Sequence, residues 1–179
     1  FYPEDMEVQN YIFGVWKRMA KEFGYQEYSA SILEPAELYR SKSGDEIVNE
    51  QMYVFTDKGD REVALRPEMT PSLARMIAAR RKGLKLPLRW FSIPNCFRYE
   101  RPQRGRKREH WQLNADIFGV TSISAEIETI AMAVDITRAY GLKDSDFEVR
   151  INNRKVMNYV TREVLSLDEA KAHTLAKLI

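Results

Sequence analysis

The sequence has few of the residues on which several classes of enzyme depend. It contains one cysteine, Cys96, and two histidines among 179 residues. A single cysteine excludes an internal disulfide and a cysteine-based zinc cluster, and it fits a reducing compartment. The histidines do not form an HExxH pattern, so we expect no metal bound by the chain's own residues. No apolar run approaches the roughly 18 residues that cross a membrane, and no signal peptide precedes the first predicted helix. We therefore expect a cytoplasmic protein with no membrane partner.

The sequence also lacks the common phosphate-binding motifs. Neither GxxxxGK[ST] nor GxGxxG is present, which excludes a P-loop and a Rossmann fingerprint. There is no serine elbow and no evident cysteine–histidine pair, and this argues against covalent nucleophilic catalysis. A nucleotide ligand would have to be held by side chains on a sheet.

What is present is typical of a globular domain. Hydrophobic residues make up 44% of the chain, charged residues 30%, and the formal net charge is +2. Such a small net charge gives no overall basic field, so a nucleic-acid surface would have to be local. The chain opens at Phe1 without a methionine and stops at Ile179 inside a predicted helix, so we expect a fragment of a longer protein.

Hydrophobic periodicity predicts helices and strands in mixed order, with hairpins. Helices are expected from Pro3 to about Gly24, from an N-cap at Thr70 to about Arg81, from about Ser124 to Tyr140, and from about Arg154. The expected strands cover 25–33, 52–56, 62–65, 88–93, 95–101, a long run over 106–117, and 147–151; residues 40–51 are expected to be a mobile loop. This order predicts an α+β fold with a largely antiparallel β-sheet flanked by helices.

The long predicted strand has one polar face. Period two places six residues on it: Arg106, Arg108, His110, Gln112, Asn114 and Asp116. A solvated face is the ordinary interpretation of such a pattern. However, this face grades from arginine through amide to carboxylate, and Arg98 and Glu100 share a face of the preceding strand. If the two faces pair, the hairpin forms a floor that suits a polyphosphate at one end and a polar, partly cationic group at the other, since arginine binds phosphate through two parallel hydrogen bonds.

Three segments resemble a known family. FRYERPQRGRKREHWQ resembles motif 2 of class II aminoacyl-tRNA synthetases (here about 89–119), in the form found in the histidyl-tRNA synthetase family. FGYQEYSASILEP resembles motif 1 (about 23–35), with Pro35 as its proline, and ALRPEMT resembles the family's LRPE-x-T segment. The sister enzymes for threonine, proline or glycine share motif 2, but the ERPQ-x-GR-x-RE tip followed by Gln and an acid four residues later is typical of the histidine enzyme.

The resemblance implies a role for each polar residue of this region. Arg98 would clamp the α-phosphate of ATP and the attacking carboxylate, Glu100 would approach the adenine amino group, and Arg106 and Arg108 would hold the outer phosphates, with Mg²⁺ supplying further positive charge. His110 stands where many relatives stack a phenylalanine on adenine. Glu68, Thr70 and Gln112 would take the α-ammonium of histidine. Asp116, where many relatives carry glutamate, would accept a hydrogen bond from the imidazole.

The same resemblance implies that part of the enzyme lies elsewhere. The motif 3 arginine, a second histidine-pocket segment and the anticodon-binding domain would follow Ile179, so we expect the isolated chain to be inactive. Motif 1 implies a homodimer, and the activity implies tRNA for histidine as a partner. Two alternatives remain open: the histidine-sensing regulatory subunit of ATP phosphoribosyltransferase, and a nucleic-acid-binding domain that uses RPQRGRKR as a basic loop.

Overall fold

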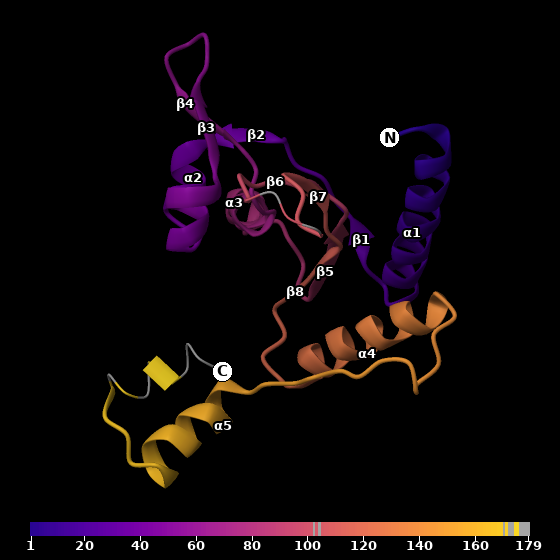
Figure 1. The fold of residues 1–179 in the computed structure, drawn as a ribbon, viewed down its shortest axis with the longest axis vertical. Helices are drawn as coiled ribbons and strands as arrows, with labels where there is room; N and C mark the ends of the chain where they lie inside the picture. Colours follow the sequence, from indigo (N-terminus) through magenta and orange to yellow (C-terminus); the bar gives the residue numbers. More distant parts are fainter. Residues whose placement is uncertain (102, 104, 170, 172–173, 176–179) are drawn as a thin grey trace. The chain divides into compact units, whose positions relative to one another are not determined.

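The computed structural model describes residues 1–101, 103, 105–169, 171 and 174–175. The chain forms two compact units, Phe1–Gly141 and Leu142–Ile179, and each is described by itself (Figure 1). Among the described residues, no helix is long and apolar enough to cross a membrane.

The first helix agrees with its prediction. Helix α1 (Pro3–Glu22) begins with a proline in its first turn and with Glu4 and Asp5, whose negative charges oppose the helix dipole. It ends before Gly24, whose φ of 81° lies in the left-handed region that glycine adopts without strain. Its buried residues are Val15, Met19 and Ala20, and these form the side that packs into the core.

In the part of the chain that the structure describes, the strands form three small sheets rather than one. The first contains β1 (Gln26–Glu27), β5 (Leu88–Ser92) and β8 (Asn114–Phe118), with β1 parallel to β5 and β8 antiparallel to it. The second has the order β2 (Leu33–Pro35), β4 (Glu62–Leu65), β3 (Tyr53–Thr56), and all its pairs are antiparallel. The third pairs β6 (Asn95–Phe97) with β7 (Glu109–Trp111). The predicted α+β class and mainly antiparallel pairing are confirmed.

The predicted long strand is divided into β7 and β8, and the strand predicted for 95–101 ends at Phe97. The division falls opposite Pro94, which has no N–H to donate to a ladder. The register nevertheless continues across the gap: Ser92 pairs with Asn114, the Gln112 N–H donates to the Pro94 carbonyl at 3.1 Å, and Cys96 pairs with His110. Residues opposite each other in this register point to the same side, so the predicted polar face is preserved.

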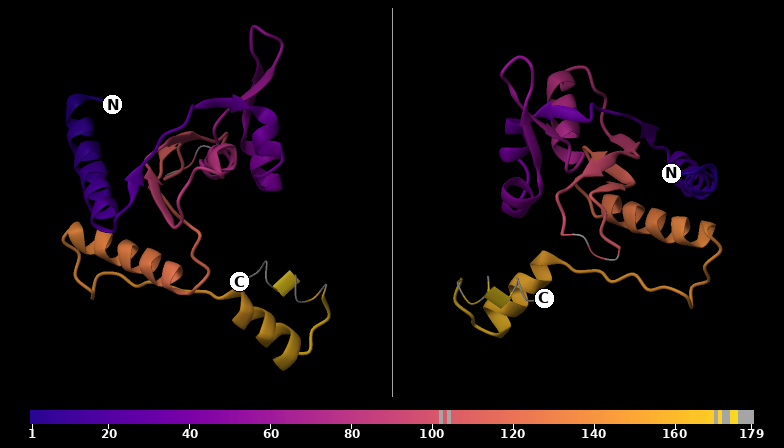
Figure 2. Two further views of the ribbon diagram at one scale, coloured as in Figure 1. Left: turned by 180° about the vertical axis from the view of Figure 1, so that it is seen from behind. Right: turned by 45° about the horizontal axis from the view of Figure 1, so that its top comes forward.

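The main core lies on the other side of β5 and β8. It is built from Ala20, Tyr25, Phe91 and Met132, with Leu113, Ala115, Ile117 and Ile136 packed against it. Helices α1 and α4 (Ser124–Ala139) lie together on this side of the sheet, and the Tyr140 hydroxyl donates to the Ile12 carbonyl at 3.0 Å (Figure 2). Within this helix Met132 is buried, whereas Ile127 is 59% exposed.

The region predicted as a mobile loop, residues 40–51, is helical in its last part. Helix α2 (Ala36–Arg40) ends where this region begins, and a π-helical turn, η1 (Ile47–Gln51), closes it, so the loop prediction was wrong for that part. Helix α3 (Thr70–Arg80) follows the hairpin of β3 and β4 as expected, but Met69 rather than Thr70 is its N-cap residue, and no side chain caps it. A long apolar residue at this position is fixed by packing, since Met69 is only 1% exposed.

The second unit holds α5 (Arg154–Tyr159) and the π-helical turn η2 (Val160–Val164). Asn153 caps α5 by accepting hydrogen bonds from the N–H groups of Lys155 and Val156. The strand predicted for 147–151 was wrong, because within the described part of the chain this segment pairs with no other strand. Without a neighbouring strand, the N–H and C=O groups of an extended segment have no ladder hydrogen bonds to hold them as a strand.

Candidate active site

The basic end of the polar face is closed by an ion pair. The Arg106 guanidinium donates to Glu100 Oε2 at 3.0 Å, and the Arg98 N–H donates to the Arg108 carbonyl at 2.9 Å. These contacts extend the β6–β7 register beyond the last strand residues. Two predicted ATP-binding residues, Glu100 and Arg106, therefore contact each other directly.

The Glu100 carboxylate is 15% exposed and the Arg106 guanidinium 59% exposed, so the pair sits at the rim of the face. Residues 102 and 104, in the connection between β6 and β7, lie outside the described residues. Arg108, which is predicted to share the phosphates with Arg106, lies over the ring of Tyr99, with 4.1 Å between the guanidinium carbon and the ring centroid. The edge of the Tyr99 ring meets Tyr53 of β3 with centroids 5.7 Å apart.

Arg98 lies next to this pair, closer to β6, and its side chain is held by the backbone of the LRPE-x-T segment. Its Nε donates to the Pro67 carbonyl at 3.0 Å, which leaves the ends of its guanidinium for other partners. His110, on the neighbouring strand, feels this charge: burial first, and then the positive charge of Arg98, hold the pKa of His110 below its ordinary value, while Glu100 opposes them. The neutral form of the imidazole is therefore favoured at pH 7.

His110, Gln112 and Cys96 form a contact chain in the middle of the face. Gln112 Nε2 lies 3.4 Å from His110 Nε2, and the Cys96 thiol donates to Gln112 Oε1 at 3.8 Å. Cys96 is fully buried, and burial raises the pKa of its thiol. A buried thiol that stays protonated is a packing residue, not a nucleophile.

A buried arginine holds the LRPE-x-T segment against β6. Arg66 is 5% exposed, and its Nε and Nη2 donate to the backbone and side-chain oxygens of Asn95 at 2.7 Å each. Its Nη1 donates to the Ala30 carbonyl at 2.9 Å, and the Phe97 N–H donates to the Arg66 carbonyl at 2.9 Å. The planar fork of arginine reaches partners in two directions at once. This one residue therefore joins the segment after β1, the LRPE-x-T segment and the hairpin.

The hydrogen bonds of Arg66 bring Glu68 toward the centre of the polar face. Glu68 is half-buried, accepts a hydrogen bond from the Ser43 hydroxyl, and lies close enough to Cys96 for its charge to raise the pKa of that thiol. Thr70 is exposed at the start of α3. The structure thus brings Glu68 together with the Arg98–Cys96–Gln112 region.

Asp116 occupies the far end of the same face, directly opposite Trp90 of β5. It is half-buried, and burial raises the pKa of its carboxyl above the ordinary value. From Arg106 to Asp116, the predicted gradient from arginine through amide to carboxylate is present in one continuous register.

Several residues of the site carried no signal in the sequence. Arg66 was noted only as part of ALRPEMT, and the buried hydroxyls of Tyr28 and Ser92 were missed. A charged residue inside an otherwise apolar run, as in VALRPEM, is the one signal that marks Arg66.

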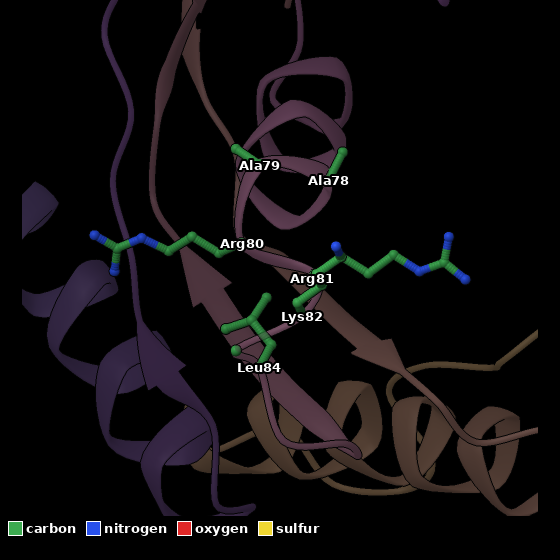
Figure 3. Close-up of a pocket in the computed structure, with 7 residues that line it drawn as sticks. Ala78, Ala79, Arg80, Arg81, Lys82 and Leu84 are labelled. Carbon is green, nitrogen blue, oxygen red and sulfur yellow. The ribbon is translucent and has the colours of Figure 1, made fainter.

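A large hollow elsewhere does not compete with this site. It measures about 610 Å³ and is lined by the end of α3, from Ala78 to Leu84. Figure 3 shows Arg80 and Arg81 pointing away from each other, so they do not converge on one anion. Arg75, earlier on the same helix, is bound to the buried Glu34 at 2.6 Å.

The face does not offer a magnesium site of its own. Among the described residues, no three histidine, cysteine or acidic side chains gather as metal ligands. Mg²⁺ is commonly held by one or two carboxylates together with substrate phosphates, so any magnesium would depend on ATP for most of its ligands.

The fold is found in known proteins. A solved structure from Bacillus halodurans, described as an ATP phosphoribosyltransferase regulatory subunit/histidyl-tRNA synthetase, superposes with a TM-score of 0.83 over 98% of this chain and 44% of its own, at 26% identity. The fold is that of a class II aminoacyl-tRNA synthetase catalytic domain.

Sequence comparisons define the relationship further. The family model for histidyl-tRNA synthetase matches residues 1–179, so the chain belongs to the histidyl-tRNA synthetase family. It is 50% identical to the histidine–tRNA ligase of Leptospira biflexa over 100% of this chain and 41% of that protein. It is 44% identical to the chloroplastic/mitochondrial histidine–tRNA ligase of Arabidopsis thaliana over 91% of this chain and 33% of that protein. The chain thus spans about two fifths or less of the length of these curated relatives.

Proposed function

We propose that the chain is the ATP- and histidine-binding part of a histidine–tRNA ligase. The complete protein activates histidine with ATP, releases pyrophosphate, and transfers histidine to the 3′ end of its tRNA. The observation that carries the proposal is the single register that aligns Arg98, Gln112 and Asp116 along one face. The histidine–tRNA ligases to which the chain is similar support the same function.

The first reaction needs no general base. A carboxylate oxygen of histidine attacks the α-phosphorus, the bond from that phosphorus to the bridging oxygen breaks, and pyrophosphate leaves with the electron pair. Catalysis of such a displacement is mainly alignment and neutralisation of charge. Arg98 is suited to both tasks, because its Nε is already bound to Pro67 and its orientation is thereby fixed before substrates arrive.

Each end of the face would bind a different substrate. Arg106 and Arg108 are proposed to hold the outer phosphates and Glu100 the adenine amino group, with His110 as a neutral ring against the base. Glu68, Thr70 and Gln112 are proposed to bind the α-ammonium, and Asp116 the imidazole. When bound with ATP, Mg²⁺ supplies additional positive charge at the phosphates.

The remaining parts of the enzyme are also proposals. We place motif 3 and the anticodon-binding domain outside this chain, assign dimer formation to motif 1 around Pro35, and expect the protein to act in the cytoplasm. The isolated 179-residue chain is accordingly expected to form no adenylate.

The regulatory-subunit alternative is not favoured. A histidine sensor needs the amino-acid end of the face but has little use for Arg98, Glu100, Arg106 and Arg108 together. The curated relatives are histidine–tRNA ligases, including one at 50% identity. A plain nucleic-acid-binding domain would not explain Gln112 and Asp116 at the far end of the register.

The proposal is tested by charging. The complete protein is incubated with ATP, Mg²⁺, labelled histidine and total tRNA, and label bound to tRNA is measured. Histidine-dependent labelling is expected. Thermal stabilisation by histidine without labelling or pyrophosphate exchange would contradict the ligase and support the sensor.

A further inference from the structure

Three buried polar atoms on the Asp116 face have no partner. Among the described residues, the Tyr28 hydroxyl, Ser92 Oγ and Asn114 Oδ1 are buried and make no hydrogen bond. A buried polar atom without a partner costs free energy, so most such atoms in folded proteins are paired. Three of them in one place require an explanation.

The pairing of the strands puts all three on one side of the sheet. Ser92 pairs directly with Asn114, and Trp90 pairs directly with Asp116, so these four share a side. Tyr28 follows β1, and its N–H donates to the Phe91 carbonyl at 2.9 Å, which places it beside Ser92. Its ring packs on Trp90 with centroids 5.8 Å apart. Tyr28 therefore lies over the residue that stands opposite Asp116.

The charge of Asp116 affects the pKa of Tyr28. Burial raises the pKa of Tyr28 to about 12; the neighbouring Ser92 hydroxyl lowers it, the nearby Asp116 carboxylate raises it by a smaller amount, and Arg66 lowers it. The hydroxyl is therefore protonated at neutral pH and has a proton to donate. Asp116 itself accepts no hydrogen bond from the described residues and owes its raised pKa to burial alone.

We propose that Tyr28 is a specificity-determining residue of the amino-acid pocket, whose hydroxyl forms a hydrogen bond with the substrate side chain beside Asp116, with Ser92 and Asn114 completing a polar wall. This rests on the proposed function. A neutral imidazole has one donor nitrogen and one acceptor nitrogen. Asp116 accepts from the donor, and the Tyr28 hydroxyl provides the donor that a carboxylate lacks. An apolar side chain would leave all these groups unpaired and would be rejected.

The test is Tyr28→Phe in the complete protein, with Tyr25→Phe as a matched control. The Tyr25 hydroxyl is also buried without a hydrogen-bond partner among the described residues, but Tyr25 belongs to the core cluster on the opposite side of the sheet. Each variant loses one oxygen from one tyrosine. The KM values for histidine and ATP are measured by pyrophosphate exchange, and melting temperatures are measured with and without histidine.

Tyr28→Phe is expected to raise the KM for histidine about three- to tenfold, as loss of one neutral hydrogen bond does, and to leave the KM for ATP unchanged. It should also reduce the thermal stabilisation by histidine. Its melting temperature without histidine should fall little, because the hydroxyl makes no hydrogen bond of good geometry with the described residues. Tyr25→Phe should leave both KM values unchanged, and Ser92→Ala should act in the same direction as Tyr28→Phe.

The outcomes separate this proposal from the proposed function. Histidine-dependent exchange by the wild type with an unchanged KM for histidine in Tyr28→Phe overturns the role of Tyr28 and leaves the ligase intact. Equal increases in the KM for histidine in Tyr28→Phe and Tyr25→Phe also overturn it, since the effect would then follow from the fold. A wild type that neither exchanges with histidine nor is stabilised by it overturns both.

Discussion

Arg106 Nη1 lies 3.0 Å from Glu100 Oε2, so two side chains proposed to bind different parts of ATP are bound to each other. The pair neutralises both charges at the rim of the face. Binding of ATP in the proposed manner would exchange this ion pair for an ion pair of Arg106 with phosphate and a hydrogen bond from the adenine amino group to Glu100. The pair thus keeps both residues in place without leaving an unpaired charge.

Replacing Arg106 should therefore weaken ATP binding with little effect on folding. Arg106→Gln is expected to raise the KM for ATP about ten- to a hundredfold, since hydrogen bonds to charged groups are stronger than neutral ones. The free energy of unfolding should change by less than about 1 kcal/mol, because the guanidinium is largely exposed. Steady-state exchange kinetics and urea unfolding provide the two measurements.

A matched control is available in the β3–β4 hairpin. Arg61 forms an exposed ion pair with Asp57 at 2.7 Å, and Arg61→Gln should leave the KM for ATP unchanged. Equal effects of the two substitutions on this KM would contradict a phosphate-binding role for Arg106.

Arg66 should behave in the opposite way. Arg66→Leu removes three buried hydrogen bonds, two to Asn95 and one to the Ala30 carbonyl. We expect a loss of about 2–4 kcal/mol in the free energy of unfolding, measured by urea denaturation. Arg80→Leu, at an exposed position of α3, should cost less than about 1 kcal/mol. If Arg66→Leu lowers the free energy of unfolding no more than Arg80→Leu does, the hydrogen bonds of Arg66 do not stabilise the fold.

The carboxylate of Asp116 should lower stability at neutral pH. Burial raises its pKa above the ordinary value of 3.8, so the stability contributed by its neutral form is present below 3.8 and is lost as pH rises through the raised pKa. Asp116→Asn carries no charge. It should therefore melt at a higher temperature than the wild type at pH 7, and the difference should disappear as pH falls below 3.8.

The same substitution should impair binding of the amino acid. Asp116→Asn is expected to raise the KM for histidine about tenfold or more, because a charge-assisted hydrogen bond becomes a neutral one. Asp60→Asn, in the exposed turn of the β3–β4 hairpin, should change neither property. A variant at Asp116 that is less stable than the wild type at pH 7 would contradict the unfavourable burial of its charge.

The alternation of polar and apolar residues was sufficient to predict the face of the hairpin but not its interruption. Period two placed Arg106 and Asp116 on one side, and the register that continues past Pro94 agrees with this. The interruption itself depends on one proline in the partner strand, which the pattern of the long strand does not contain. The burial of Met132 in α4 depends on how the helix meets Phe91 and Ala20, and periodicity does not define that contact.

The supporting residues were harder to predict than the proposed ligands. Arg66 contacts backbone oxygens of segments 29 and 36 residues away along the chain, and backbone acceptors leave no trace in a sequence. Tyr28 and Asn114 acquire their significance only from strand pairing. Thr70 was predicted as an N-cap from its residue type, whereas packing of Met69 shifted the helix start by one residue.

The central claim is that one face of this hairpin joins ATP to histidine. The most direct test is amino-acid-dependent ATP–pyrophosphate exchange by the complete protein, run separately with each standard amino acid. We predict exchange with histidine alone. Exchange with a different amino acid, or no exchange although histidine stabilises the protein against heat, would contradict the claim.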